Sequence, residues 1–186
     1  IVSFNPAETQ NKQMLAKMCQ SLTHRGPDDW GMFVDNSVGL GITRLSIIDI
    51  EGGHQPMSNE DKTIWIVFNG EIYNFLELRH WLEKLGHCFS TRSDTEVILH
   101  AYEQFGGECV DLLNGMFAFA IWDKQGNKLF MARDRFGIKP LHYTIVNGSL
   151  IFGSELKAIL IHPKVKREIN LVALNEYLSF EYVPSP

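Results

Sequence analysis

The chain has 186 residues, which is the size of one globular domain with room for a short extension. Hydrophobic residues make up 45% of it and charged residues 21%, a composition too rich in core-forming side chains for a disordered protein. Its 17 basic and 22 acidic residues give a net charge of −5, and the charges are interspersed rather than blocked. We therefore expect a small-molecule or protein partner, and neither a nucleic acid nor an anionic membrane surface.

Three further features bear on where the protein works. The longest apolar run, Met116 to Trp122, is far shorter than the roughly 20 residues that cross a bilayer. The first residues, Ile1 to Pro6, have neither the basic start nor the apolar stretch of a signal peptide. The 3 cysteines include no C-x-x-C pair, which favours reduced, buried thiols over disulfides or a structural zinc site. These features predict a cytoplasmic protein with no membrane segment.

The spacing of hydrophobic residues predicts the elements of the first half in chain order. We expect a short strand at 1–4, a helix at 9–22, a hairpin of strands at 31–34 and 38–42, and a strand buried on both faces at 64–68. Two helices follow, which begin after Asn74 and Ser93 and end at Gly86 and Gly106. Asn74 and Ser93 are each followed three residues later by Glu, an arrangement typical of a helix N-cap.

The second half changes from helical to strand periodicity. Strands are expected at 116–122, 129–133, 141–146 and 150–152, joined by glycine-containing turns as in an antiparallel meander. Asn147-Gly148 predicts a tight hairpin turn, and helical segments are expected at 155–160 and 171–178. Together these elements predict an α+β layered domain with largely antiparallel sheets.

Several common site signatures are missing from the sequence. It has no G-x-x-x-x-G-K-[ST] segment, and the stretch 39–44 lacks the last glycine of a dinucleotide-binding loop. The 7 histidines include no H-E-x-x-H or H-x-H pair, so we predict no metal site. No G-x-S-x-G segment is present either. The residues by themselves therefore show no nucleotide site and no nucleophile.

Asn69 and Gly70 follow directly after the predicted buried strand and have two interpretations. An uncharged side-chain amide and a neighbouring backbone N–H are the kind of donors that stabilise an oxyanion, at about 2.7–3.1 Å from the oxygen. Asn-Gly is also the strongest short-range signal for a hairpin turn. On the pattern alone, the turn is favoured.

Arg44 and Asp94 are the other candidate binding residues. Arg44 lies among apolar residues, where a guanidinium needs a carboxylate, supplied either by the protein or by a ligand. Asp94 either complements a helix N-terminus or holds a ligand ammonium group. Together the two could hold both charges of an α-amino acid. The segments 24–28 and 133–137 are interpreted as turns held by structural ion pairs.

Several blocks of sequence resemble the N-terminal glutamine amidotransferase domain of glutamine-hydrolysing asparagine synthetases, and they occur in the order of that family over nearly the whole chain. They are His24-Arg25-Gly26-Pro27-Asp28, Arg44-Leu45-Ser46-Ile47-Ile48-Asp49, Phe68-Asn69-Gly70-Glu71-Ile72-Tyr73-Asn74, Ser93-Asp94-Thr95-Glu96, Gly115-Met116-Phe117-Ala118-Phe119-Ala120, Arg133-Asp134-Arg135-Phe136-Gly137-Ile138-Lys139-Pro140-Leu141 and Ser154-Glu155-Leu156-Lys157. The resemblance implies a class II amidotransferase with the N-terminal-nucleophile fold, a four-layer αββα sandwich of two antiparallel sheets between helices.

The resemblance also implies a role for each candidate residue. Asn69 and Gly70 would form the oxyanion hole, Arg44 would bind the α-carboxylate of glutamine, and Asp94 with Glu71 its α-ammonium group. The nucleophile of the family is an N-terminal cysteine followed by glycine, and Ile1 aligns with the next residue. We therefore expect the printed sequence to lack its nucleophile through truncation or because its terminus is not included, rather than through natural loss; none of its own cysteines occupies that position.

The same resemblance implies partners and boundaries. The amidotransferase domain is expected at 1–180, and 181–186 would begin the connection to a C-terminal synthetase domain that uses ATP and Mg to convert aspartate to asparagine. No cofactor is expected in the amidotransferase domain itself, and a homodimer is left open. Two alternatives remain: a natural non-catalytic scaffold domain that has lost its nucleophile, or another class II amidotransferase.

Overall fold

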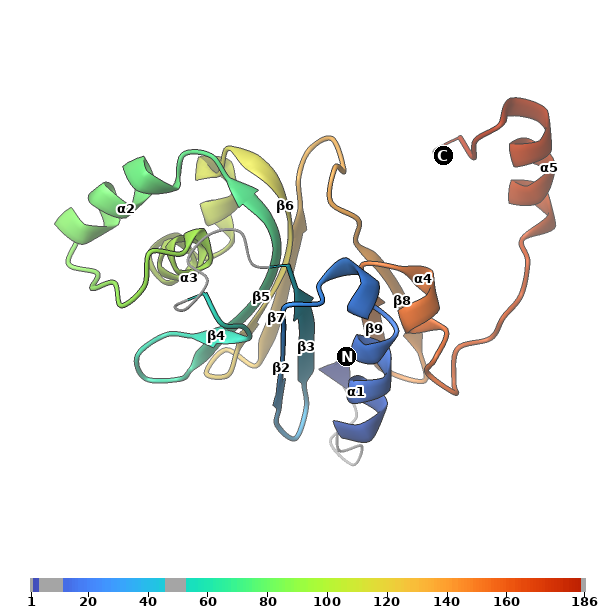
Figure 1. Ribbon diagram of the computed structural model, residues 1–186, viewed down its shortest axis with the longest axis horizontal. Helices are drawn as coiled ribbons and strands as arrows, with labels where there is room; N and C mark the ends of the chain where they lie inside the picture. Colours follow the sequence, from blue (N-terminus) through green and yellow to red (C-terminus); the bar gives the residue numbers. More distant parts are fainter. Residues whose placement is uncertain (1, 4–11, 46–52, 185–186) are drawn as a thin grey trace.

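The computed structural model describes residues 2–3, 12–45 and 53–184, and its elements stack in four layers (Figure 1). Two helices, α2 (Phe75–Lys84) and α3 (Asp94–Phe105), form the first layer. The second layer is an antiparallel sheet, and the third consists of further strands. Helices α1 (Lys12–Gln20) and α4 (Leu156–Ile159) form the fourth layer. The predicted α+β architecture with helices outside and sheets inside is confirmed.

Three hydrogen-bonded sheets make up the two inner layers within the described part of the chain. The larger one has the order β4-β5-β6-β7, with strands Met57–Ser58, Ile64–Ile72, Gly115–Asp123 and Lys128–Arg133. The third layer combines the hairpin β2-β3 (Asp29–Val34, Gly39–Arg44) with the sheet β1-β9-β8 (Val2–Ser3, Ser149–Gly153, His142–Val146). All pairings are antiparallel. The strands expected as one meander therefore divide between two layers, with β7 in one and β8 in the other.

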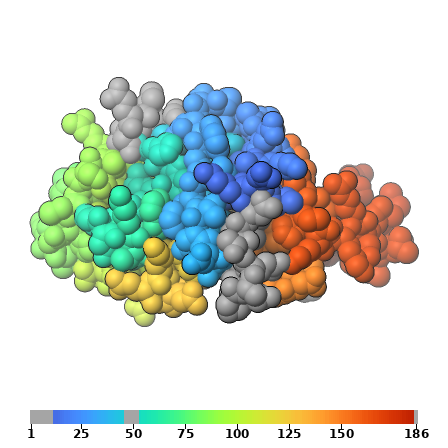
Figure 2. Space-filling view, turned by 90° about the horizontal axis from the view of Figure 1, so that it is seen from below, coloured from blue at the N-terminus to red at the C-terminus, as the bar shows by residue number. Residues whose placement is uncertain are grey.

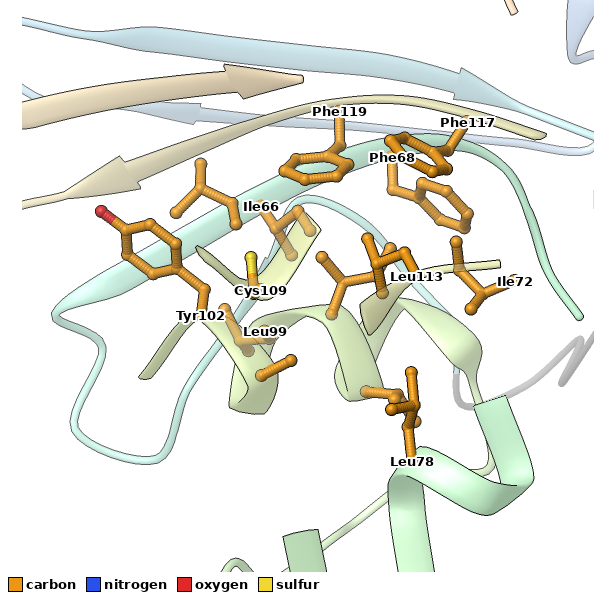
Figure 3. Close-up of a cluster of buried hydrophobic side chains, with 14 of the residues drawn as sticks. Ile66, Phe68, Ile72, Leu78, Leu99, Tyr102, Cys109, Leu113, Phe117 and Phe119 are labelled. Atoms are coloured by element: carbon orange, nitrogen blue, oxygen red, sulfur yellow. The ribbon is translucent and has the colours of Figure 1, made fainter. Parts of the chain in front are cut away.

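The main hydrophobic core lies between the β5-β6 face and the two helices of the first layer (Figure 3). Ile66 and Phe68 from β5 and Phe117 and Phe119 from β6 point toward α3, as expected for alternate residues of paired strands. Leu99 of α3 packs against them and is fully buried. This core fixes α3, and with it the residues at its N-terminus, against the sheet.

A second core fills the space between the two strand layers. Val67 and Trp65 of β5 contribute to it from the opposite face of the strand, together with Leu40 of β3 and Trp122 of β6. The prediction that the strand beginning at Ile64 is buried on both faces is therefore confirmed. A smaller cluster, which includes Met18 and Ile159, holds α1 and α4 to β9.

Of two short features that the pattern predicts, a helix cap at Asn74 and a turn at Asn147-Gly148, only the first differs in its side-chain contacts. Asn74 precedes α2 as predicted, but its side chain does not cap that helix. Its Nδ2 donates to the Leu112 carbonyl and its Oδ1 accepts from the Asn114 N–H, so it links α2 to the start of β6. Asn147 and Gly148 form the predicted hairpin turn, with φ of 50° and 76°.

The remaining helix, α5 (Leu171–Phe180), stands apart from the layers and has no buried residue. It follows an extended segment after α4 and projects from one end of the molecule (Figures 1 and 2). Its exposed side chains include Leu171, Val172, Leu178 and Phe180. No helix within 2–3, 12–45 or 53–184 has the length and apolar character needed to cross a bilayer.

Candidate functional site

One cavity of about 320 Å³ brings all the predicted site residues together. Its lining includes Arg44, Asn69, Gly70, Glu71 and Asp94, which come from β3, β5 and the first turn of α3. The volume lies at the lower end of the range of small-molecule pockets. The cavity therefore places a guanidinium group, an amide and two carboxylates, from separate parts of the sequence, around one space.

Asn69 and Gly70 lie inside β5 and form no turn, so the interpretation favoured by the pattern alone is wrong. They pair with Ala118 and Phe117 of β6. The strand continues through Ile72 because β6 supplies a partner that the local sequence does not reveal. A tertiary pairing has thus overridden the turn propensity of Asn-Gly.

The antiparallel alternation directs the Gly70 N–H to the cavity edge of β5. The N–H and carbonyl groups of Phe117, opposite Gly70, both bond to Asp134, so this pair is not hydrogen bonded across β5 and β6. The N–H groups of Phe68, Gly70 and Ile72 therefore all face the same edge of β5, away from β6. On this edge the Phe68 N–H donates to the Gln55 Oε1 at 2.7 Å, and the Ile72 N–H donates to the Asp94 Oδ2 at 3.1 Å. The Gly70 N–H lies between these two along the strand.

Only glycine fits at position 70. A Cβ atom there would lie 2.1 Å from the Met116 carbonyl oxygen, and the residue has a φ of 157°. The strand can therefore approach β6 this closely only without a side chain.

Asp94 is the first residue of α3 and is only 4% exposed. Its Oδ2 accepts a hydrogen bond from Ile72, while the helix is capped by Ser93, whose Oγ accepts from the Thr95 N–H at 3.1 Å. Burial raises the pKa of the Asp94 carboxyl to about 6, opposed by the Ile72 N–H and assisted by the charge of Glu71. Asp94 is therefore a buried acid that ionises close to neutral pH.

Arg44 ends β3, and the turn 24–28 holds its backbone. The Asp28 N–H donates to the Arg44 carbonyl at 3.1 Å, and a Cβ atom on Gly26 would lie 2.4 Å from the Arg44 nitrogen. The predicted ion pair of this turn is present, since Arg25 Nη1 lies 3.1 Å from Glu155 Oε1. The turn thus fixes the position from which Arg44 reaches the cavity.

Gln55 is a site residue that sequence reasoning missed. It is 4% exposed; its Oε1 accepts from Phe68 and its Nε2 donates to the Thr95 Oγ1 at 3.2 Å. It therefore bridges the strand that carries Asn69 and the helix that carries Asp94. An isolated glutamine 13 residues before its strand partner gives no local signal of this role.

Asp134 organises another wall of the cavity. Its carboxylate accepts from the N–H groups of Phe117, Phe136, Ile138 and Lys139, and Lys139 lines the cavity. Burial would raise its pKa, but these four donors lower it below the ordinary value. The predicted turn is present and includes an exposed ion pair, since Arg135 Nη2 lies 3.9 Å from Asp111 Oδ1. The Asp134 carboxylate itself is bound by backbone N–H groups, which hold a buried carboxylate without a second charge.

The predicted thiol environment is only partly found. Cys19 and Cys109 are buried, and burial raises the pKa of Cys19 to about 11 and that of Cys109 to about 12. Cys88 is exposed, so the prediction of buried thiols is wrong for this residue, which lies in the segment that connects α2 to α3.

Comparison with known proteins decides the family. The family described as "Glutamine amidotransferase domain" matches residues 1–186. The chain belongs to this family. As an amidotransferase domain it is 51% identical, over 97% of its length, to asparagine synthetase [glutamine-hydrolyzing] 1 of Bacillus subtilis. It is also 44% identical, over 94% of its length, to a putative asparagine synthetase [glutamine-hydrolyzing] 2 of Methanocaldococcus jannaschii.

This amidotransferase domain spans 28% of the Bacillus subtilis protein and 38% of the Methanocaldococcus jannaschii protein. Among solved structures it is similar to a glutamine phosphoribosylpyrophosphate amidotransferase from B. subtilis, with a TM-score of 0.71 and 22% identity. That likeness covers 83% of this chain and 41% of the other. It supports the expected fold.

Proposed function

We propose that the cavity is a glutaminase site, which hydrolyses glutamine to glutamate and ammonia. One observation carries the proposal: a single cavity contains Arg44, Glu71 and Asp94, which suit the charged end of an amino acid, together with Asn69 and Gly70, which suit an oxyanion. The family to which the chain belongs is consistent with this chemistry.

In this proposal the substrate is held by its ionic groups. The guanidinium of Arg44 pairs with the α-carboxylate of glutamine, and the carboxylates of Asp94 and Glu71 bind the α-ammonium group. The pKa of Asp94, about 6, leaves its carboxylate ionised at neutral pH and above, as this role requires. The binding groups thus anchor the end of the substrate that does not react.

The nucleophile in this mechanism is the thiol of an N-terminal cysteine that precedes Ile1, with its proton taken by its own α-amine. The register of β1 on β9 supports that location. Val2 pairs with Leu150 and Ser3 with Ser149. Because the pairing is antiparallel, residues that precede Val2 would lie opposite residues of β9 that follow Leu150. That end of β9 leads to Phe152 and Gly153, which line the cavity. A residue ahead of Ile1 would continue in that direction.

The chemical step needs two donors for the oxygen of the substrate amide. The thiolate adds to the amide carbon, and the Asn69 Nδ2 and the Gly70 N–H stabilise the oxyanion. Ammonia leaves as a thioester forms, and water then hydrolyses the thioester to release glutamate and the thiol. Placing both donors on a paired strand would hold them in position before the charge develops.

We further propose that the ammonia serves a synthetase domain in a longer, cytoplasmic protein, which makes asparagine from aspartate. The names of the relatives and the 28% and 38% of their lengths that the chain spans support this. ATP and Mg would act in that domain and not in this one. We place the amidotransferase domain at 1–180, and 181–186 would begin the connection.

The test is ammonia release from glutamine by the chain prepared with Cys-Gly ahead of Ile1, its terminus verified by intact mass. Asn69→Ala should lower kcat by about 10²–10³, the loss expected for one oxyanion donor. Arg44→Ala should raise KM with a smaller effect on kcat, because it contacts a part of the substrate that does not react.

Arg135→Ala is the matched control, since this side chain is 66% exposed and outside the cavity lining. It should leave both kinetic constants unchanged. A folded chain with a verified terminal cysteine and no ammonia release would refute the glutaminase proposal and favour a non-catalytic scaffold. An unchanged kcat in Asn69→Ala would remove Asn69 from the oxyanion hole.

A further inference from the structure

Outside the cavity, three side chains that can ligate a metal ion lie together where the segment after α2 meets α3. His87 belongs to that segment, and His100 and Glu103 lie one turn apart on α3. Each offers a ligand atom, and the three atoms lie within 4.8 Å of one another. Glu103 Oε2 is 2.6 Å from His100 Nδ1 and 3.6 Å from His87 Nδ1, so the carboxylate contacts both imidazoles.

Two of these side chains have partners that orient them. His87 Nε2 lies 3.0 Å from the Gln104 Oε1; when it donates there, the lone pair of its Nδ1 is left on the side of Glu103. Glu103 Oε1 accepts from the Asn59 Nδ2 at 2.7 Å, which leaves Oε2 for the histidines. Such outer partners commonly fix the orientation of histidine and carboxylate ligands.

The third side chain, His100, is 2% exposed. Its Nε2 is buried and makes no hydrogen bond within the described residues. This nitrogen lies 3.9 Å from an oxygen of Glu60 and 3.9 Å from an oxygen of Glu96. A His100 that binds a metal ion through Nδ1 carries its proton on Nε2, where both carboxylates favour it.

The charge around the cluster favours a cation. The carboxylates of Glu60, Glu96 and Glu103 surround the His100 imidazole. A divalent ion bound at the His100 Nδ1 would be attracted by these negative charges.

We propose that His87, His100 and Glu103 form a binding site for a divalent transition-metal ion, best matched by Zn²⁺. Two histidines and one carboxylate are a known zinc ligand set that leaves a fourth position for water. Ligand atoms of a tetrahedral zinc site are about 3.3 Å apart, as follows from metal–ligand distances of about 2.0–2.1 Å. The His87–Glu103 separation of 3.6 Å is close to this, and the His100–Glu103 separation of 2.6 Å must widen by about 0.7 Å. The two histidine nitrogens, which lie within 4.8 Å of each other, must come closer by up to about 1.5 Å.

The site would tie the segment after α2 to the C-terminal half of α3. Sequence reasoning predicted no metal site because the histidines lack the usual short spacings. The structure instead brings together one residue of a connecting segment and an i, i+3 pair on a helix. His87 and Glu103 have side chains 16% and 20% exposed, so an ion can enter from solvent.

The experiment is titration of metal-free chain with ZnCl₂, followed by calorimetry and by thermal unfolding. All variants carry Cys88→Ser, because Cys88 is exposed and adjacent to His87, and a free thiol also binds zinc. The proposal requires one Zn²⁺ per chain and a rise of Tm on zinc addition. His87→Gln and Glu103→Gln should each weaken binding by about 100-fold or more, since losing even an outer partner costs about 10–100-fold.

His80→Gln is the matched control, because its side chain is 75% exposed and it lies on α2 outside the cluster. It should bind Zn²⁺ like the parent. Co²⁺ in place of Zn²⁺ should give the intense visible absorption of a four-coordinate site. Absence of saturable binding to folded chain, or equal affinity in His87→Gln and the parent, would overturn the proposal. Neither result depends on glutaminase activity.

Discussion

At the scale of single residues, the protonation of Asp94 controls the proposed binding of glutamine. Its pKa is about 6 because the carboxyl is buried, so the charged form is lost as the pH falls through this value. The ammonium group of glutamine stays charged over the same range. The affinity for glutamine should therefore fall by up to about ten-fold per pH unit below 6. Calorimetry on the chain that begins at Ile1, from pH 5 to 7.5, measures this without turnover.

Asp94→Asn supplies the control and a second readout. The variant should bind glutamine weakly at every pH and show no step near 6. The pKa of Asp94 is higher in the folded state than in the unfolded state, so ionisation of Asp94 lowers the free energy of unfolding. This loss of stability is complete above about pH 6 and disappears as the pH falls toward 3.8. Asp94→Asn should thus unfold at a higher temperature than the parent at pH 7.5. A pH-independent affinity in the parent would contradict the role given to Asp94.

The five predicted site residues line one cavity, but the local pattern by itself misplaced two of them. The pattern alone favoured a turn at Asn69-Gly70, because the pairing that extends β5 comes from β6, which lies more than forty residues further along the chain. Gln55 escaped notice for a related reason. It bonds to groups remote in sequence, and a single buried polar residue has no periodicity to reveal it.

At the scale of elements, the caps of α3 and α5 should differ in their effect on stability. Ser93 and Asn170 both cap their helices through their side chains. Ser93→Ala should lower the free energy of unfolding by about 1 kcal/mol, because α3 is part of the main core. Asn170→Ala should leave the unfolding midpoint unchanged and reduce only helix content, since α5 has no buried residue. Urea unfolding followed by circular dichroism compares the two.

Equal loss of stability in both variants would show that α5 packs against the core in solution.

The elements themselves were largely predictable, because helix and strand periodicities are local properties of the sequence. The assignment of the strands to the two inner layers was harder to predict from the sequence. The strands β6 to β9 look alike in sequence, and only the loop 134–141, ordered by Asp134, carries the chain from one sheet to the other.

At the scale of the whole molecule, α5 is an appendage of the folded body. A chain that ends at Glu168 should have the same Tm as the full chain within about 1 °C, because removing α5 exposes no core residue. It should also self-associate less, since Leu171, Val172 and Phe180 are removed with it. Calorimetry and analytical ultracentrifugation measure these two effects. A Tm lower by several degrees would instead make α5 part of the cooperative unit.

The hydrogen bonds of Gln55 and Asp134 have a consequence for how the cavity meets a ligand. Gln55 braces the edge of β5 against α3, and Asp134 braces the loop to Lys139 against β6. Both sets of bonds are made entirely between groups of the protein. Binding of an amino acid would therefore require little further ordering of side chains and loops, and the entropic cost of binding would be small. Affinity would then depend mainly on how well the shape and charges of the ligand match those of the cavity.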